Sequence, residues 1–70
     1  MSEAALTWTD TAEIGYRLWK AHPEVNPLSV RFTDLHAWVL ALDGFRGAAE
    51  ESNEGLLEAI QMAWLDEAED

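Results

Sequence analysis

This chain contains no cysteine, and in 70 residues that absence is the strongest constraint on how it can fold. Domains of this size bury only about 60% of the surface that the unfolded chain exposes, so many of them depend on disulfides or metals. Here disulfides, thiolate metal sites and thiol nucleophiles are all excluded. Four tryptophans are the available substitute, since each brings about 200 Å² of largely apolar surface to a core. We therefore expect a single domain, residues 1–70, built around aromatic side chains.

The stretch from Thr33 to Leu42 has the clearest helical pattern in the chain. Its apolar residues recur at i, i+3, i+4 and i+7, so they lie within one stripe of a helix surface. Thr33 is in the position of an N-cap, and Asp34 follows it where negative charge is favourable. We expect this helix to place its tryptophan in the core and to pack through Leu35, Trp38, Val39 and Leu42.

A first helix is predicted to begin at Thr9 or Asp10. Asp10 and Glu13 have the spacing of a capping box. The helix is expected to end at His22, because the residue before Pro23 is disfavoured in the α conformation. The stripe predicted to face the core consists of Ile14, Leu18 and Ala21.

A third helix is predicted to begin at Ser52 or Asn53 and to continue through the periodic apolar residues that follow. Its buried stripe is expected to consist of Leu56, Leu57, Ile60, Ala63 and Trp64.

Two connections join these helices. Asn26 and Pro27 predict a short helical turn before the central helix. In residues 43–47, two glycines flank Phe45, which indicates a loop or wing with the phenylalanine packed on the core. The predicted fold class is therefore all-α: a small three-helix domain, of modified winged-helix type, with at most one very short strand pair.

Negative charge is concentrated in the last third of the chain. The net charge is −10, from 14 acidic and 4 basic residues, and residues 48–70 contain eight acids and no base. Such a surface repels phosphate, and residues 34–42 contain no Lys or Arg, so DNA binding is excluded on electrostatic grounds. A basic protein surface or a hard cation would be attracted. The alternative is a solvated acidic tail that keeps the domain soluble.

The residue patterns of enzyme active sites are missing from the sequence. It contains no nucleophile–base pair, P-loop, dinucleotide-binding glycine pattern or zinc motif, so we expect a protein that is not an enzyme. His22 and His36 have no partner at metal-ligand spacing and are predicted to be surface or capping residues. Glu54 and Glu58 repel each other at i, i+4, an arrangement explained by cation binding, by partner binding or by weak selection. Carboxylate oxygens suit hard cations, iron in its harder forms included, but a helix face would hold an ion weakly.

Composition predicts where the protein is located in the cell and how its two termini behave. The segment MSEAAL lacks the basic region and apolar run of a signal peptide, and no stretch approaches the roughly 20 apolar residues of a membrane span. We expect a soluble, cytoplasmic monomer that does not bind membranes. Residues 1–6 are expected to be flexible, and residues 67–70 to form an acidic tail.

Several short blocks along the chain are distinctive: WTD at residues 8–10, EIG at 13–15, Pro27 followed by VRFTDLH at 30–36 and Trp38, SNE at 52–54, LEAI at 57–60 and WLDEA at 64–68. Together these blocks resemble the IscX family of iron–sulphur cluster assembly. The resemblance extends from about Leu6 to Glu69. It departs from the family pattern in the wing, Gly44 to Glu51, where Arg46 and two glycines replace expected carboxylates.

The resemblance implies a small acidic adaptor that binds a basic patch of the cysteine desulfurase and competes there with frataxin and ferredoxin. It also implies weak iron binding by surface carboxylates, without a cluster held by the protein itself. The candidate iron ligands are Glu54, Glu58, Asp66 and Glu67. The residues expected to contact the partner are Asp10, Glu13, Asp34, Glu54, Glu58 and Leu65.

The sequence is compatible with two other functions. One is an iron-donor or iron-storage protein for cluster assembly, and the other is a generic acidic protein-interaction module. Within the family blocks, Arg31 is expected to have a structural role, pairing with a carboxylate or a helix C-terminus. The side chains expected in the core are Trp38, Ile60 and Trp64.

Overall fold

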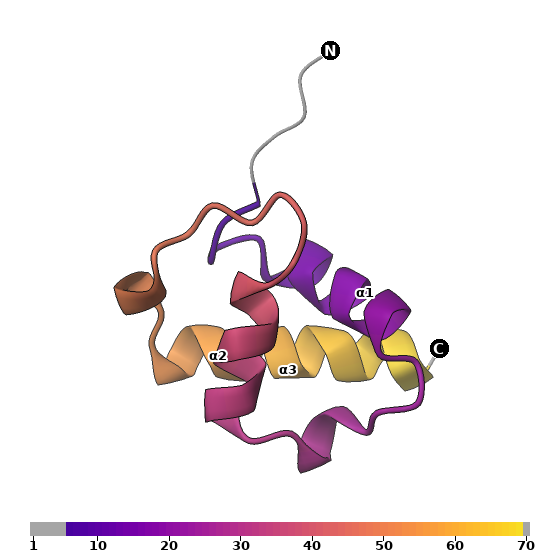
Figure 1. The fold of residues 1–70 in the computed structure, drawn as a ribbon. Helices are drawn as coiled ribbons and strands as arrows, with labels where there is room; N and C mark the ends of the chain where they lie inside the picture. The colour runs from indigo at the N-terminus through magenta and orange to yellow at the C-terminus, as the bar shows by residue number, and fades with distance from the viewer. Residues whose placement is uncertain (1–5, 70) are drawn as a thin grey trace.

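The structure of the protein, a computed structural model, describes residues 6–69. These residues form three α-helices, α1 (Thr11–Ala21), α2 (Phe32–Leu40) and α3 (Glu54–Glu69). Two short 3₁₀ turns, η1 (Pro27–Ser29) and η2 (Ala49–Glu51), lie in the connections before and after α2. Figure 1 shows α2 crossing the N-terminal half of α3, while α1 lies over its C-terminal half. The predicted all-α fold with three helices is confirmed.

The core lies between α3 and the two helices that cross it. Gly15 allows α1 to approach α3 closely, because a Cβ at this position would lie 2.6 Å from the backbone nitrogen of Trp64. Burying an apolar side chain contributes about 1.5–3 kcal/mol, so a few such residues stabilise a domain of this size. The buried apolar residues are Leu6, Trp8, Ile14, Leu18, Leu35, Val39, Leu57, Ile60 and Trp64.

Helix α1 begins and ends close to the predicted positions, but its capping differs. The Asp10 side chain forms no cap; its carboxylate accepts a hydrogen bond from the backbone nitrogen of Thr7 at 2.9 Å. Glu13 bonds Arg17 instead, so the predicted capping box is wrong. His22 ends the helix, as predicted. The prediction that Ala21 faces the core is also wrong: it is exposed, because α1 ends there and the chain turns at Pro23.

Helix α2 begins one residue before the predicted cap. Arg31 occupies the N-cap position without a side-chain cap, and Thr33 is an exposed residue of the first turn. Leu35 and Val39 are fully buried, as predicted. Trp38 is only partly buried, which corrects its placement in the core. Trp38 lies at the edge of the apolar stripe of α2, whose central residues are Leu35 and Val39. Its ring stacks on His22 with centroids 4.2 Å apart.

Helix α3 starts where the sequence predicts. The Asn53 side-chain oxygen accepts a hydrogen bond from the backbone nitrogen of Leu56 at 2.9 Å, which is an N-cap. Ile60 and Trp64 are fully buried, and the helix continues to Glu69. Residues 67–69, expected to form an acidic tail, are therefore the last turn of α3, and Asp70 lies outside the described residues.

The N-terminal segment and the wing hold each other in place. Leu6 forms an isolated parallel bridge with Phe45, and Arg46 donates its backbone N–H to the Leu6 carbonyl at 2.8 Å. Phe45 packs against the core, as predicted. Within the segment 1–6 that is expected to be flexible, Leu6 is 5% exposed and makes these contacts, while residues 1–5 lie outside the described part of the chain. Gly44 has φ of 80°, which only glycine adopts readily.

The connection before α2 follows its prediction. The Asn26 side chain accepts a hydrogen bond from the backbone nitrogen of Leu28 at 3.0 Å, and Pro27 begins η1. The Gln61 side chain donates to the Pro27 carbonyl at 2.9 Å, which ties η1 to α3. Within residues 6–69, no helix combines the length and the apolar character needed to cross a membrane.

Candidate functional site

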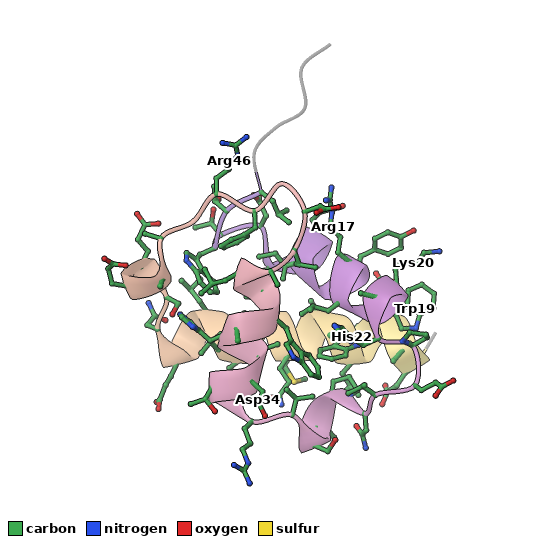
Figure 2. The ribbon with its side chains drawn as sticks, in the orientation of Figure 1. Arg17, Trp19, Lys20, His22, Asp34 and Arg46 are labelled. Carbon is green, nitrogen blue, oxygen red and sulfur yellow. The ribbon has the colours of Figure 1, made fainter. Side chains whose placement is uncertain are left out.

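The acidic residues predicted to contact a partner share an environment: each is exposed and lies near the beginning of a helix. Figure 2 shows Arg17, which pairs with a carboxylate of α1, on the opposite side of the molecule from Asp34 of α2. The predicted set therefore divides into one group at the start of α1 and a second group at the starts of α2 and α3. The first group is Asp10 and Glu13, and the second is Asp34, Glu54 and Glu58.

Most of this negative charge is not compensated within the fold. Glu13 pairs with Arg17 at 2.9 Å across one turn of α1, and this is the one ion pair found in residues 6–69. Both side chains are about half exposed, so solvent screens the pair and it contributes little to stability. The acidic residues of η2 and α3 form no ion pair in the described structure, and their charge is available to a partner.

Two further residues were given roles from the sequence, Leu65 as a partner contact and Arg31 as a structural residue. Leu65 is partly buried in the C-terminal half of α3. Arg31 is exposed, and the described structure gives its side chain no hydrogen bond or ion pair, so the expected pairing with a carboxylate or helix C-terminus is wrong. Its position immediately before α2 places it beside helix N-terminal N–H groups, which attract anions rather than a guanidinium.

The four candidate iron ligands do not converge on one point. Glu54 and Glu58 are one turn apart near the start of α3, whereas Asp66 and Glu67 lie near its end. Eight residues of helix separate Glu58 from Asp66, which is about 12 Å at 1.5 Å per residue, while a cation binds oxygen ligands at roughly 2–2.6 Å. In residues 6–69, no three His, Cys, Asp or Glu side chains gather in a way that would hold a metal ion. The iron site stays a prediction, and it would involve one or two carboxylates with water completing the coordination.

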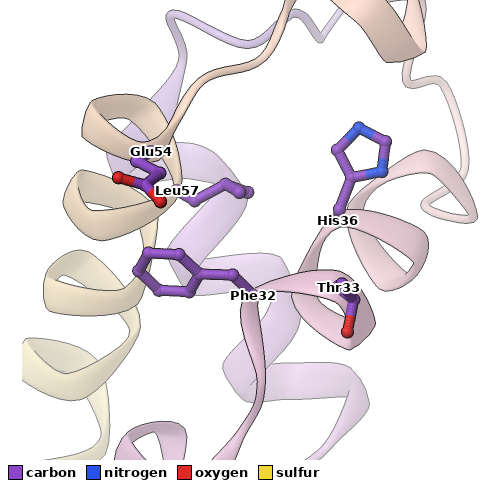
Figure 3. Close-up of a pocket in the computed structure, with 5 residues that line it drawn as sticks. All are labelled: Phe32, Thr33, His36, Glu54 and Leu57. Carbon is purple, nitrogen blue, oxygen red and sulfur yellow. The ribbon is translucent and has the colours of Figure 1, made fainter.

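A groove lies between the N-terminal parts of α2 and α3. Figure 3 shows Phe32 and Leu57 on one side of it and His36 on the other. Its volume is about 270 Å³, and its surface is mainly apolar. The lining residues are Phe32, Thr33, His36, Glu54 and Leu57.

The acidic turn η2 is fixed beside this groove by two aromatic residues. Trp8 donates its indole N–H to the Ala48 carbonyl at 2.6 Å, and the His36 Nε2 atom lies 2.9 Å from the Ala49 carbonyl oxygen. Trp8 and His36 also stack, with centroids 5.2 Å apart. The Glu51 carboxylate accepts the backbone N–H of Ala48 at 3.0 Å. The turn that carries exposed glutamates is thus attached to the core.

Both histidines pack against tryptophans rather than lying free on the surface. His22 stacks on Trp38 and His36 on Trp8, and each histidine is partly buried. His22 does end α1, as predicted, but the stacking partners were missed. Each pair joins residues at least 16 positions apart in the sequence, so local spacing carries no signal for it.

Comparison with known proteins assigns the family. A family model described as iron–sulphur cluster assembly matches residues 6–69. The chain belongs to this family, that of IscX. It is also similar to the uncharacterized protein PA3808 of Pseudomonas aeruginosa, with 46% identity over 63 residues, which cover 90% of this chain and 96% of the relative. The resemblance to IscX proteins that the sequence blocks indicate is therefore confirmed, and membership gives this chain a role in iron–sulphur cluster assembly.

The matched region of this IscX-family protein coincides with the described residues. It includes the groove, the acidic turn η2 and the exposed carboxylates of α3. It also includes Leu6 and Trp8, two core residues that the sequence pattern does not assign to the core. The family is one of small assembly proteins and not a known enzyme family.

Proposed function

We propose that this protein is an acidic adaptor in iron–sulphur cluster assembly. It docks by charge on a basic patch of the cysteine desulfurase and modulates the delivery of sulphur from that enzyme. In this role it competes for the patch with frataxin and ferredoxin. Family membership supports the process, and the surface of the protein supports the mode of binding.

The observation that carries this proposal is uncompensated negative charge on a folded surface. Residues 48–70 contain eight acids and no base, and within residues 6–69 the one ion pair involves Glu13 of α1. Glu50, Glu51, Glu54 and Glu58 are all exposed. Complementary charge accelerates encounter with a basic surface and orients the two proteins.

Salt dependence of binding tests this proposal. Affinity for the cysteine desulfurase is expected to fall on the order of tenfold between about 0.05 M and about 0.3 M NaCl, because salt screens charges on exposed surfaces. Calorimetry or surface plasmon resonance at the two salt concentrations measures the change. Equal affinity at both would show that charge does not lead the docking.

Charge reversal locates the surface. The double variant Glu54→Lys/Glu58→Lys is expected to weaken binding more than the control Glu24→Lys/Asp43→Lys, which makes the same change in net charge in exposed loops. If both variants weaken binding equally, net charge acts without a defined acidic face. The competition is tested separately: adding frataxin or ferredoxin is expected to displace the labelled adaptor from the desulfurase.

We propose that iron binding is a weak second property of the α3 carboxylates: Glu54 and Glu58, which lie one turn apart, and, as single ligands, Asp66 and Glu67, because neighbouring residues of a helix do not face each other. One or two carboxylates leave most coordination positions of Fe²⁺ to water, so millimolar Mg²⁺ or Ca²⁺ is expected to compete. Anaerobic calorimetry with Fe²⁺, in the presence and absence of these cations, measures this. A tight Fe²⁺ site that resists the competitors would favour the alternative function, an iron donor.

A further inference from the structure

The groove between α2 and α3 offers an exposed apolar surface of defined shape. Phe32, at the start of α2, is partly buried, and Leu57 is 7% exposed. Together with His36 they give the groove mainly apolar walls (Figure 3). At about 270 Å³ it is smaller than the roughly 300–1,000 Å³ of small-molecule sites. A groove of this size suits an amino-acid side chain better than a cofactor.

The surroundings of the groove are acidic. Glu54 is one of the lining residues, and Asp34 directly follows the lining residue Thr33. The turn η2, with Glu50 and Glu51, is attached to the groove through the contact between His36 and the Ala49 carbonyl. The nearest arginines in sequence are Arg31, three residues before Asp34, and Arg46, four residues before Glu50, and neither forms an ion pair within residues 6–69. An acidic segment would be repelled here, and a basic one attracted.

The walls are also held in place before any partner binds. His36 is fixed by its contact with Ala49 and by stacking on Trp8, which is 3% exposed. The Asn53 side chain caps the helix that carries Glu54 and Leu57. A preformed groove loses little conformational freedom on binding, so its apolar contact contributes more of its free energy to affinity.

We propose that this groove binds a short segment of the partner protein in which a bulky apolar side chain stands next to Lys or Arg. The apolar side chain lies between Phe32, Leu57 and His36, and the basic side chain pairs with Glu54. This inference rests on the proposed adaptor function and adds to it: the acidic face attracts the partner, and the groove selects which segment docks.

Two capped peptides test the apolar contact, Gly-Ser-Arg-Leu-Arg-Ser-Gly and a control with Ser in place of Leu. They carry the same charge, so they differ only in the side chain that would enter the groove. Titration into ¹⁵N-labelled protein, followed by amide NMR, is expected to show about tenfold tighter binding of the Leu peptide. Its shifts are expected to centre on residues 32–36 and 54–57. Equal affinities, or Leu-dependent shifts centred elsewhere, would overturn the proposal.

Matched variants identify the groove itself. Thr33→Phe fills the groove from an exposed position and is expected to remove the tenfold advantage of the Leu peptide. Ala59→Phe adds the same ring at an exposed position of α3 outside the groove and is expected to leave the advantage intact. Circular dichroism confirms that both variants fold. If the advantage survives Thr33→Phe in folded protein, the groove is not the binding site.

A second pair of variants tests the charge contact. Glu54→Gln is expected to weaken both peptides more than Glu58→Gln, which removes the same charge one turn further along α3 and does not line the groove. Equal losses would contradict pairing at Glu54.

Binding to the cysteine desulfurase separates this inference from the proposed function. Salt-dependent binding of the desulfurase together with equal affinities of the two peptides would reject the groove and leave the adaptor function standing. A Leu peptide bound in the groove, with no binding of the desulfurase, would reject that adaptor partner and leave the groove as a docking site for an apolar and basic segment.

Discussion

The four tryptophans have different environments, and these environments assign them different structural roles. Trp8 and Trp64 are buried, at 3% and 0% exposed, while Trp19 and Trp38 are partly buried. Trp8 uses its indole N–H to bind the Ala48 carbonyl. The indole N–H of Trp64 has no hydrogen-bond partner in the described structure. The two side chains are buried to a similar extent, but only the indole nitrogen of Trp8 has a hydrogen-bond partner.

Replacing each buried tryptophan by phenylalanine tests this difference. Trp8→Phe removes a hydrogen bond and leaves the Ala48 carbonyl without that donor, whereas Trp64→Phe removes a donor that has no partner. Both variants lose similar apolar area, and the Ala48 carbonyl still accepts the Glu51 backbone N–H, so Trp8→Phe is expected to destabilise the fold by about 0.5–1.5 kcal/mol more than Trp64→Phe. Urea unfolding followed by far-ultraviolet circular dichroism measures both. A larger loss for Trp64→Phe would contradict the assigned roles.

At the level of elements, the start of each helix determines how the acidic residues are displayed. Asn53 caps α3, so Glu54 lies in its first turn, exposed and beside the groove. In α2 the helix begins at Phe32 without a side-chain cap, which turns the Phe32 ring toward the groove and leaves Thr33 at its edge. A shift of one residue in a helix start rotates every later side chain by about 100°. The groove depends on these two starting points.

Alanine substitution at the two candidate caps tests this. Asn53→Ala removes the side-chain bond to the Leu56 nitrogen and is expected to cost about 1 kcal/mol of unfolding free energy. Thr33→Ala is expected to change it by less than about 0.5 kcal/mol, because Thr33 is an exposed residue within the helix and alanine has the higher helix propensity. Urea unfolding of both variants gives the comparison. Equal losses would mean that Thr33 acts as a cap after all.

For the whole molecule, charge acts against the compact state. The net charge is −10, and residues 6–69 contain one ion pair, on the surface of α1. The carboxylates that would serve docking therefore repel one another in the folded protein. The fold tolerates this because its core is apolar and no charged residue is buried within the described range.

Raising the ionic strength is therefore expected to stabilise the protein. Screening weakens the repulsion among exposed carboxylates more than it weakens the single exposed pair. An increase in NaCl from about 0.02 M to about 0.3 M is expected to raise Tm by roughly 2–5 °C. Thermal unfolding by circular dichroism measures this, and a fall in Tm would mean that attractive pairs dominate. The same salt change is expected to weaken docking, so stability and affinity should respond in opposite directions.

Local patterns predicted most of the elements. The three helices, the Asn26 cap, the start of α3 beside Asn53, the end of α1 at His22 and the packing of Phe45 were predicted from nearby residues, and all are confirmed. The family follows from short blocks in the same way. The capping box of α1 and the cap at Thr33 failed because other interactions used the same side chains or the helix began elsewhere.

The sequence by itself determined the fold class, the excess of negative charge and the family, because these depend on composition and near-neighbour spacing. Tertiary structure alone decided that Trp8 and Leu6 are buried, that His36 joins α2 to η2, and that Phe32 and Leu57 share a groove with Glu54. The physical reason is distance along the chain. Such contacts join residues 13 to 40 positions apart, and whether they meet depends on how α1, α2 and α3 pack rather than on any local pattern.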